Sequence, residues 1–210
     1  LPTTALDGSA ILTGISIVQS GDNGIETTGV NGLGGNLRVI DSTIFGSVEA
    51  GISGSGIGAT TAGTGGFILV QNSRISNAVD AGIEVVNSNL RVESSTLSNT
   101  GAIGIESQAL VSALSPFKSS TVFIDNTNIS GAVTGIQAIA GDALSYSGGA
   151  ATNAFNNLTA RDNTIFATGS GIAIQGIMET STATTPPTVT SQGVVRANIF
   201  ANDITSGDIT

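Results

Sequence analysis

Aliphatic residues recur along the chain in short groups that repeat. Residues 37–44, 90–97 and 122–129 each begin with an apolar residue, a variable residue and a second apolar residue, then continue through small polar residues to a final aliphatic one. Apolar side chains at alternate positions indicate a β-strand with one buried face. The final aliphatic residues form an aligned column: Ile17, Ile44, Ile75, Leu97, Ile129, Ile165 and Ile199.

A Gly-Ile pair follows six of these groups after six or seven residues. The pair predicts a second short strand in each repeat, and we expect its glycine to free the backbone for the turn into that strand. The glycines of this column are Gly24, Gly51, Gly82, Gly104, Gly135 and Gly171.

The repeats differ in length at one place only. Successive column residues are 22 to 36 residues apart, and the extra residues fall at 54–66, 108–120, 141–156 and 179–192, after the Gly-Ile strand and before the next apolar pair. A constant core with length variation at one corner is typical of a solenoid. The sequence therefore predicts an all-β, right-handed parallel β-helix of about seven rungs, with insertions at one corner and a single domain over residues 1–210.

The repeat apolar-x-apolar-x-[Asp/Asn]-[Ser/Thr/Asn]-x-Ile, followed by Gly-Ile, resembles the parallel β-helix repeats of the pectin-lyase-like superfamily over residues 10–205. The resemblance implies hydrogen-bonded ladders of stacked Asn or Ser side chains at a bend between strands. Two adjacent polar columns lie at this point of the repeat, and we expect the first to form the ladder. The first column is Asp41, Asn72, Ser94, Asn126 and Asp162, and the second is Ser42, Ser73, Ser95, Thr127 and Asn163.

That superfamily contains polysaccharide lyases and hydrolases, phage tailspikes, autotransporter passengers and adhesins, so the resemblance leaves function open. The hydrolases carry Asp-Asp and Gly-His-Gly motifs, and the chain has neither. It has no His, Cys or Trp at all, which excludes a Ser-His-Asp triad, a thiolate nucleophile, a zinc cluster and disulfides. These absences favour a non-catalytic member that needs no cofactor.

The net charge and mean hydropathy of the chain narrow the classes of partner that it is expected to bind. The formal net charge is −9, which disfavours nucleic acid and anionic membranes as partners. Mean hydropathy is +0.31, yet no apolar run approaches the roughly 20 residues of a membrane helix, so no membrane span is predicted. We expect a segment of a longer extracellular or cell-surface protein.

Carboxylates suggest two places where chemistry could occur. Glu84 and Glu106 follow Gly-Ile pairs of successive repeats, so their carboxylates should lie about 5 Å apart. They could form a solvated acidic stripe, part of a Ca²⁺ site or a retaining glycosidase pair. Asp125 and Arg161 also share a column, either as an exposed ion pair or as a lyase-type arginine beside acidic Ca²⁺ ligands.

The insertions supply the candidate ligand-binding residues, because loops on a rigid repeat are where binding tends to arise. Phe117, Lys118 and Tyr146 lie in two of them. The favoured hypothesis is an adhesive or structural scaffold that binds a surface glycan or protein, or associates with itself end to end. The alternative is a polysaccharide-active lyase or hydrolase, and a third is a receptor-binding, tailspike-like module.

Overall fold

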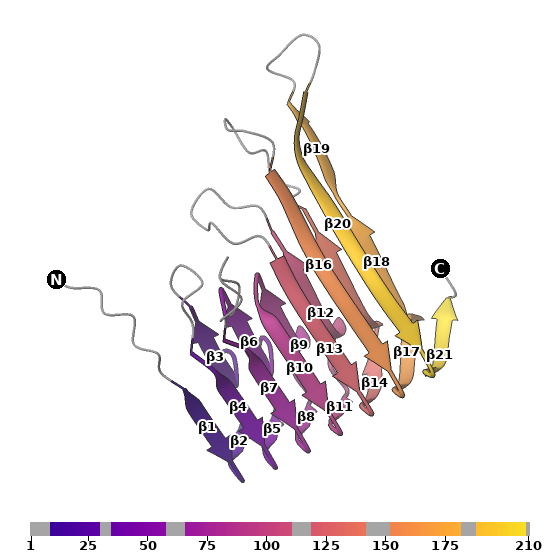
Figure 1. Cartoon of the computed structure of the whole chain (residues 1–210). Coiled ribbons are helices and arrows are strands. Elements are labelled where there is room, and N and C mark those ends of the chain that lie inside the picture. Colours follow the sequence, from indigo (N-terminus) through magenta and orange to yellow (C-terminus); the bar gives the residue numbers. More distant parts are fainter. Residues whose placement is uncertain are drawn as a thin grey trace, which may run out of the picture.

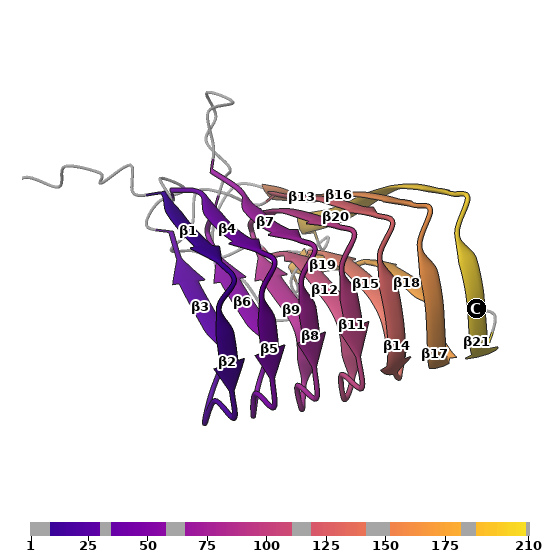
Figure 2. The same ribbon diagram turned by 90° about the horizontal axis from the view of Figure 1, so that it is seen from below.

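The computed structural model describes residues 9–29, 35–57, 66–110, 119–141, 152–181 and 188–208. These residues form three sheets, here called A, B and C, and the chain passes through one strand of each in turn before it begins the next rung (Figure 1). Seen from below, the rungs stack side by side, and each sheet A strand bends directly into a sheet B strand (Figure 2). Every pairing is parallel except that of β19 with β20.

The strands follow one another in each sheet in a simple order. Sheet A is β1 (Ala10–Thr13), β4 (Leu37–Ile40), β7 (Ile68–Gln71), β10 (Asn89–Glu93), β13 (Ser119–Asp125), β16 (Thr152–Arg161), β20 (Thr188–Phe200) and β19 (Met178–Ser181). Sheet B is β2 (Ser16–Val18), β5 (Thr43–Phe45), β8 (Arg74–Ser76), β11 (Thr96–Ser98), β14 (Asn128–Ala132), β17 (Thr164–Ser170) and β21 (Asp203–Asp208). Sheet C is β3 (Ile25–Thr28), β6 (Ile52–Ser55), β9 (Ala81–Val86), β12 (Ile103–Ala109), β15 (Thr134–Ala140) and β18 (Ile172–Gly176).

This architecture confirms the predicted parallel β-helix, with two differences in detail. Each of the first six rungs has three strands rather than two, because the column of final aliphatic residues belongs to a sheet B strand of its own. The prediction that Ile199 is the seventh member of that column was wrong. Ile204 pairs with Ile165 in sheet B, whereas Ile199 pairs with Ala160 in sheet A. The long antiparallel excursion through β19 and β20 shifts the position of the last repeat.

One apolar cluster fills the inside of the rungs. Each strand of the central rungs contributes aliphatic side chains that stack on the equivalent residue of the next rung, as Val70 does on Val92. Both of those side chains, like Ile83 and Ile105 of sheet C, are completely buried. In the described residues this narrow, continuous core consists of aliphatic side chains, and burial of their surface stabilises it.

The Gly-Ile glycines are required by close packing rather than by a turn. None of the six has a left-handed φ, so the expectation that glycine frees the backbone for a turn at this position was wrong. A Cβ on Gly82 would lie 2.6 Å from the carbonyl oxygen of Gly104 and 2.7 Å from the side chain of Leu97. A Cβ on Gly24 would likewise lie 2.6 Å from the carbonyl oxygen of Gly51, and a Cβ on Gly135 would lie 2.6 Å from that of Gly171. The column therefore lets the backbones of successive rungs approach at the entry to sheet C.

The length variation falls where it was predicted. The segments 30–34, 58–65, 111–118 and 142–151 each separate a sheet C strand from the next sheet A strand. Between β9 and β10 the same corner needs only Asn87 and Ser88. Despite these differences, β10 pairs in continuous register with both β7 and β13. We call this edge of the rod the C–A corner.

Replacing Gly82 by Ala should lower the free energy of unfolding by about 1–3 kcal/mol, because the new methyl group meets a backbone carbonyl that cannot move aside without shifting a rung. Denaturant unfolding measures the change. Gly21→Ala is the matched control, since a Cβ at Gly21 meets no atom within 4 Å. Equal stability of the two variants would contradict the close-packing role of the glycine column.

Candidate functional site

The bend between sheets A and B uses the two polar columns for different purposes. Asp41, Asn72, Ser94, Asn126 and Asp162 all have φ between 47° and 54°, and their side chains point to solvent. Asn, Asp and Ser tolerate this left-handed conformation better than bulky residues do. The first column therefore makes the bend. Apart from one hydrogen bond from Asn126 to Ser94, it does not form the predicted ladder.

The buried second column forms the ladder. The amide of Ser42 donates to Ser73 Oγ at 3.1 Å, and the amide of Ser73 donates to Ser95 Oγ at 3.2 Å. Further along, Thr127 N donates to Asn163 Oδ1 at 2.9 Å. These contacts satisfy corner amides that a sheet cannot pair, so side chains continue the hydrogen bonding where the strands stop.

A second ladder lies at the C–A corner and was not anticipated. Ile57 N donates to Ser88 Oγ at 3.0 Å, and Ser88 N donates to Ser120 Oγ at 3.2 Å. Asn156 continues the column and donates to Ile139 O at 3.0 Å. The sequence carries the signal, because each of these polar residues stands two positions before an apolar residue of one buried column, Leu90, Val122 or Leu158.

Glu84 and Glu106 lie together on the outer face of sheet C. Their strands β9 and β12 place them directly opposite each other in adjacent rungs, and both are half-buried. Desolvation raises the pKa of both carboxyls. The negative charge of Glu106 raises the pKa of Glu84 further, whereas a 2.7 Å hydrogen bond from Gln108 lowers that of Glu106.

This acidic pair satisfies one requirement of carboxylate catalysis, since environments that favour a protonated carboxyl suit a general acid. Within the described ranges, no group of three or more His, Cys, Asp or Glu side chains could hold one ion. Asp80 adds a further negative charge nearby and raises the pKa of both glutamates.

The outer face of sheet A brings together charge and aromatic rings. Arg161 donates two hydrogen bonds to Asp125, from Nε to Oδ1 at 2.9 Å and from Nη2 to Oδ2 at 2.8 Å, which confirms the predicted ion pair. This hydrogen bonding lowers the pKa of Asp125. Arg161 also lies over the Phe123 ring, 5.2 Å from its centroid, and Arg91 lies over the same ring at 5.1 Å. Arg91 is itself paired with Glu93.

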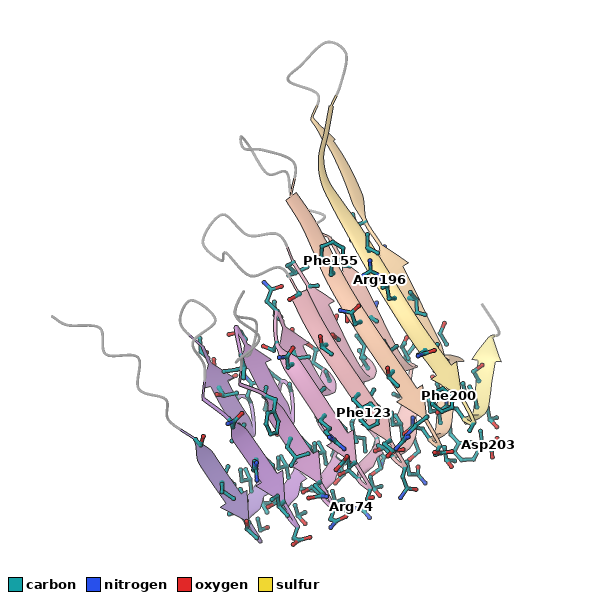
Figure 3. The ribbon with its side chains drawn as sticks, viewed as in Figure 1. Arg74, Phe123, Phe155, Arg196, Phe200 and Asp203 are labelled. Atoms are coloured by element: carbon teal, nitrogen blue, oxygen red, sulfur yellow. The ribbon has the colours of Figure 1, made fainter. Side chains whose placement is uncertain are left out.

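Arginine–phenylalanine contacts recur along this face. Arg38 lies 5.7 Å from the Phe67 centroid, and Arg196 lies 5.4 Å from that of Phe155. Figure 3 shows Phe155 and Arg196 side by side on β16 and β20, with Phe123 on β13. Four of the chain's five arginines therefore stack on phenylalanine in one sheet. Sequence analysis missed this face because the partners belong to different repeats and meet only through strand register.

Two shallow hollows lie on the same face. The first, of about 300 Å³, is lined by Phe67, Asn89, Leu90, Arg91, Thr121 and Phe123. The second, of about 360 Å³, is lined by Asn157, Leu158, Thr159, Arg196, Ala197 and Asn198. The predicted ligand-binding residues Phe117, Lys118 and Tyr146 lie outside the described residues.

Replacing Glu84 by Gln should stabilise the protein at pH 7 by up to about 1 kcal/mol, a limit set by the solvent exposure of the pair. A carboxyl whose pKa is raised on folding binds its proton more tightly in the folded state, so the stability it contributes falls as pH rises above its unfolded pKa. The gain of the variant should vanish near pH 3.5, where both proteins carry a neutral group.

Thermal unfolding of parent and Glu84→Gln from pH 3.5 to 7 measures this difference. Glu26→Gln is the control, because Ser53 separates Glu26 from Glu84 in the same column and no second glutamate adjoins it. A parent more stable than Glu84→Gln at pH 7 would show that the Glu84 carboxylate has a favourable partner.

No family model, curated protein or solved structure matches the chain. In the part of the chain that the structure describes, no helix has the length and apolarity needed to cross a membrane. The structure itself establishes the parallel β-helix and its two polar corner ladders.

Proposed function

We propose that this chain is a non-catalytic binding scaffold: a rigid β-helix that presents ligand-binding segments from its C–A corner at the surface of a cell. The observation that carries the proposal is the restriction of length variation to that corner. Segments as different as Asn87–Ser88 and residues 110–118 join the same two sheets, and the strands after them stay in register. A repeat that tolerates new segments at one edge can acquire binding without loss of its core.

Composition supports this function over catalysis. The chain lacks the His and Cys side chains that serve as general base or nucleophile in many enzymes. We further propose that it is an adhesin-like member of the pectin-lyase-like superfamily, from an extracellular bacterial protein, because its repeat pattern and three parallel sheets accord with that group. Its partner would be a glycan or a protein on another surface.

Shortening one corner tests the scaffold function. The change deletes residues 110–119 and replaces Ala109 by Asn, so that β12 joins β13 by the same route as Val86-Asn87-Ser88 joins β9 to β10. We expect the variant to fold with parallel-sheet structure by circular dichroism, because the buried residues of the rungs are kept apart from Ala109, the last residue of β12. We expect at least about tenfold weaker binding to its ligand.

The probe for this test is an array printed with neutral and acidic glycans, fibronectin, laminin and collagen, read with fluorescently labelled protein. Val48→Ser, at an exposed position on the opposite corner between β5 and β6, is the control and should bind as the parent does. Absence of binding by the parent, or unchanged binding by a well-folded shortened variant, would contradict a binding role for this corner.

A second function is favoured by one observation, the paired and half-buried Glu84 and Glu106 with raised pKa values. If the chain cleaves polysaccharides, this pair is the catalytic site. Turnover of soluble acidic and neutral polysaccharides, measured as new reducing ends, should then fall by at least about 10²-fold in Glu84→Gln and in Glu106→Gln. Absence of turnover by the parent protein would exclude polysaccharide cleavage as the function and leave the binding scaffold as the proposed function.

A further inference from the structure

We infer that the outer face of sheet A is a carbohydrate-binding surface that takes a neutral, hydroxyl-rich oligosaccharide lying along the rod. The primary subsite is the hollow over β10, between Phe67 and Phe123. The inference rests on the proposed binding function and assigns it a ligand class. It also places the contact on a sheet face next to the C–A corner, on a different sheet from the Glu84–Glu106 pair.

The hollow has the walls and floor of a small subsite. Its volume of about 300 Å³ is at the lower end of ligand pockets, which suits one ring of a longer chain. Phe67, the residue before β7, and Phe123 on β13 stand two rungs apart, on either side of the strand that carries Asn89 and Arg91. Phenylalanine rings offer an apolar surface to the C–H faces of a sugar ring.

The outward side chains around the hollow supply the hydrogen bonds that hydroxyl groups need. A hydroxyl both donates and accepts, and so do the side chains of Asn and Thr, whereas Arg only donates. Over β10, β13, β16 and β20 two adjacent outward columns contain no carboxylate, whereas the next outward column carries Glu93 and Asp125. The residues of the two columns without a carboxylate are Asn89, Thr121, Asn157 and Arg196 in one column and Arg91, Phe123, Thr159 and Asn198 in the other.

The arginines in and beside the hollow, Arg91 in its lining and Arg161 over the ring of Phe123, are fixed before a ligand arrives. Arg91 is held by Glu93 and by the ring of Phe123, and Gln71 donates to the other oxygen of Glu93 at 3.3 Å. Arg161 is held from the opposite side by Asp125 and the same ring. Side chains that are already ordered lose less conformational entropy on binding, which favours affinity on a shallow surface.

The charges around the hollow favour an uncharged ligand. Arg91 and Arg161 each already neutralise a carboxylate, and Glu93 and Asp125 lie beside the two outward columns. A polyanion would meet these two carboxylates and a chain of net charge −9, whereas a neutral sugar meets fixed donors and acceptors at no electrostatic cost.

The second hollow extends the surface in the same direction. It lies over β16 and β20 and repeats the combination of Asn, Thr and Arg found in the first. From β7 to β20 the surface crosses four rung steps, about 19 Å at the spacing of strands in a sheet. This length accommodates an oligosaccharide rather than a single sugar.

Filling the first hollow tests the inference. The intact chain is run by native affinity electrophoresis through gels that contain β-glucan, xylan, galactomannan, dextran or, as the acidic probe, polygalacturonate. We expect at least one neutral polysaccharide to retard the parent. Thr121→Phe, which places a ring in the hollow, should weaken that interaction at least about tenfold. The matched control, Thr43→Phe, adds the same ring at an exposed strand position on sheet B and should leave the interaction with the polysaccharide unchanged.

The outcomes separate this inference from the proposed function. Retardation by a neutral polysaccharide that Thr121→Phe abolishes and Thr43→Phe preserves supports the assigned surface. Retardation by polygalacturonate alone, or neutral binding that Thr121→Phe does not weaken, overturns it. If shortening the corner abolishes binding on the array while Thr121→Phe has no effect there, the proposed scaffold function is supported and the inferred carbohydrate-binding surface on sheet A is contradicted.

Discussion

The structure depends on one constraint: successive rungs must approach to strand spacing all the way round the coil, including the corners where no strand pairing exists. Sheets satisfy backbone amides along the three faces, but each corner leaves amides and carbonyls without a sheet partner. Serine, threonine and asparagine side chains fill that role at two corners, as Ser73 and Ser88 do. At the entry to sheet C, glycine instead removes the side chain that would hold the rungs apart.

These devices explain how the rod combines a fixed core with a variable edge. At the C–A corner the ladder residue stands two positions before the same buried position of sheet A, as Ser88 does before Leu90 and Ser120 before Val122. The chain therefore returns to the same hydrogen-bonded position however many residues precede it. Ser120 occupies this position after a long segment, and Ser88 occupies it after a single residue. Function can therefore vary at this edge, and on the sheet A face beside it, without disturbing the aliphatic core.

The charged groups are distributed unevenly over the surface in a way that separates two kinds of chemistry. Sheet A carries four arginines, all stacked on phenylalanine, and sheet C carries the paired glutamates Glu84 and Glu106. The first face offers ordered donors and aromatic rings, which suit recognition. The second offers carboxyls with raised pKa values, which are destabilising at neutral pH unless a ligand or proton neutralises them.

Sequence patterns predict the parts of this molecule that repeat at fixed spacing. The solenoid, the variable corner, the Glu84–Glu106 adjacency and the Asp125–Arg161 pair all follow from aligned positions. Choosing between Asp41 and Ser42 as the ladder residue required the backbone conformation, because the left-handed residue points outward and only its neighbour is buried. The position of Ile204 was obscured by the antiparallel excursion before it.

The arginine–phenylalanine face could not be predicted from single repeats. Phe123 meets Arg91 from the preceding rung and Arg161 from the following one, so the contact exists only once register is known. The same holds for the hollow between Phe67 and Phe123, which spans three strands of sheet A.

Amide hydrogen exchange tests most directly the central claim that the ladders keep the rungs in register whatever the corner length. The account predicts equally slow exchange for the amides of Val92 in β10, after the two-residue corner, and of Ile124 in β13, after the long segment. Markedly faster exchange in β13 than in β10 would contradict it, because the long segment would then loosen the rung that follows.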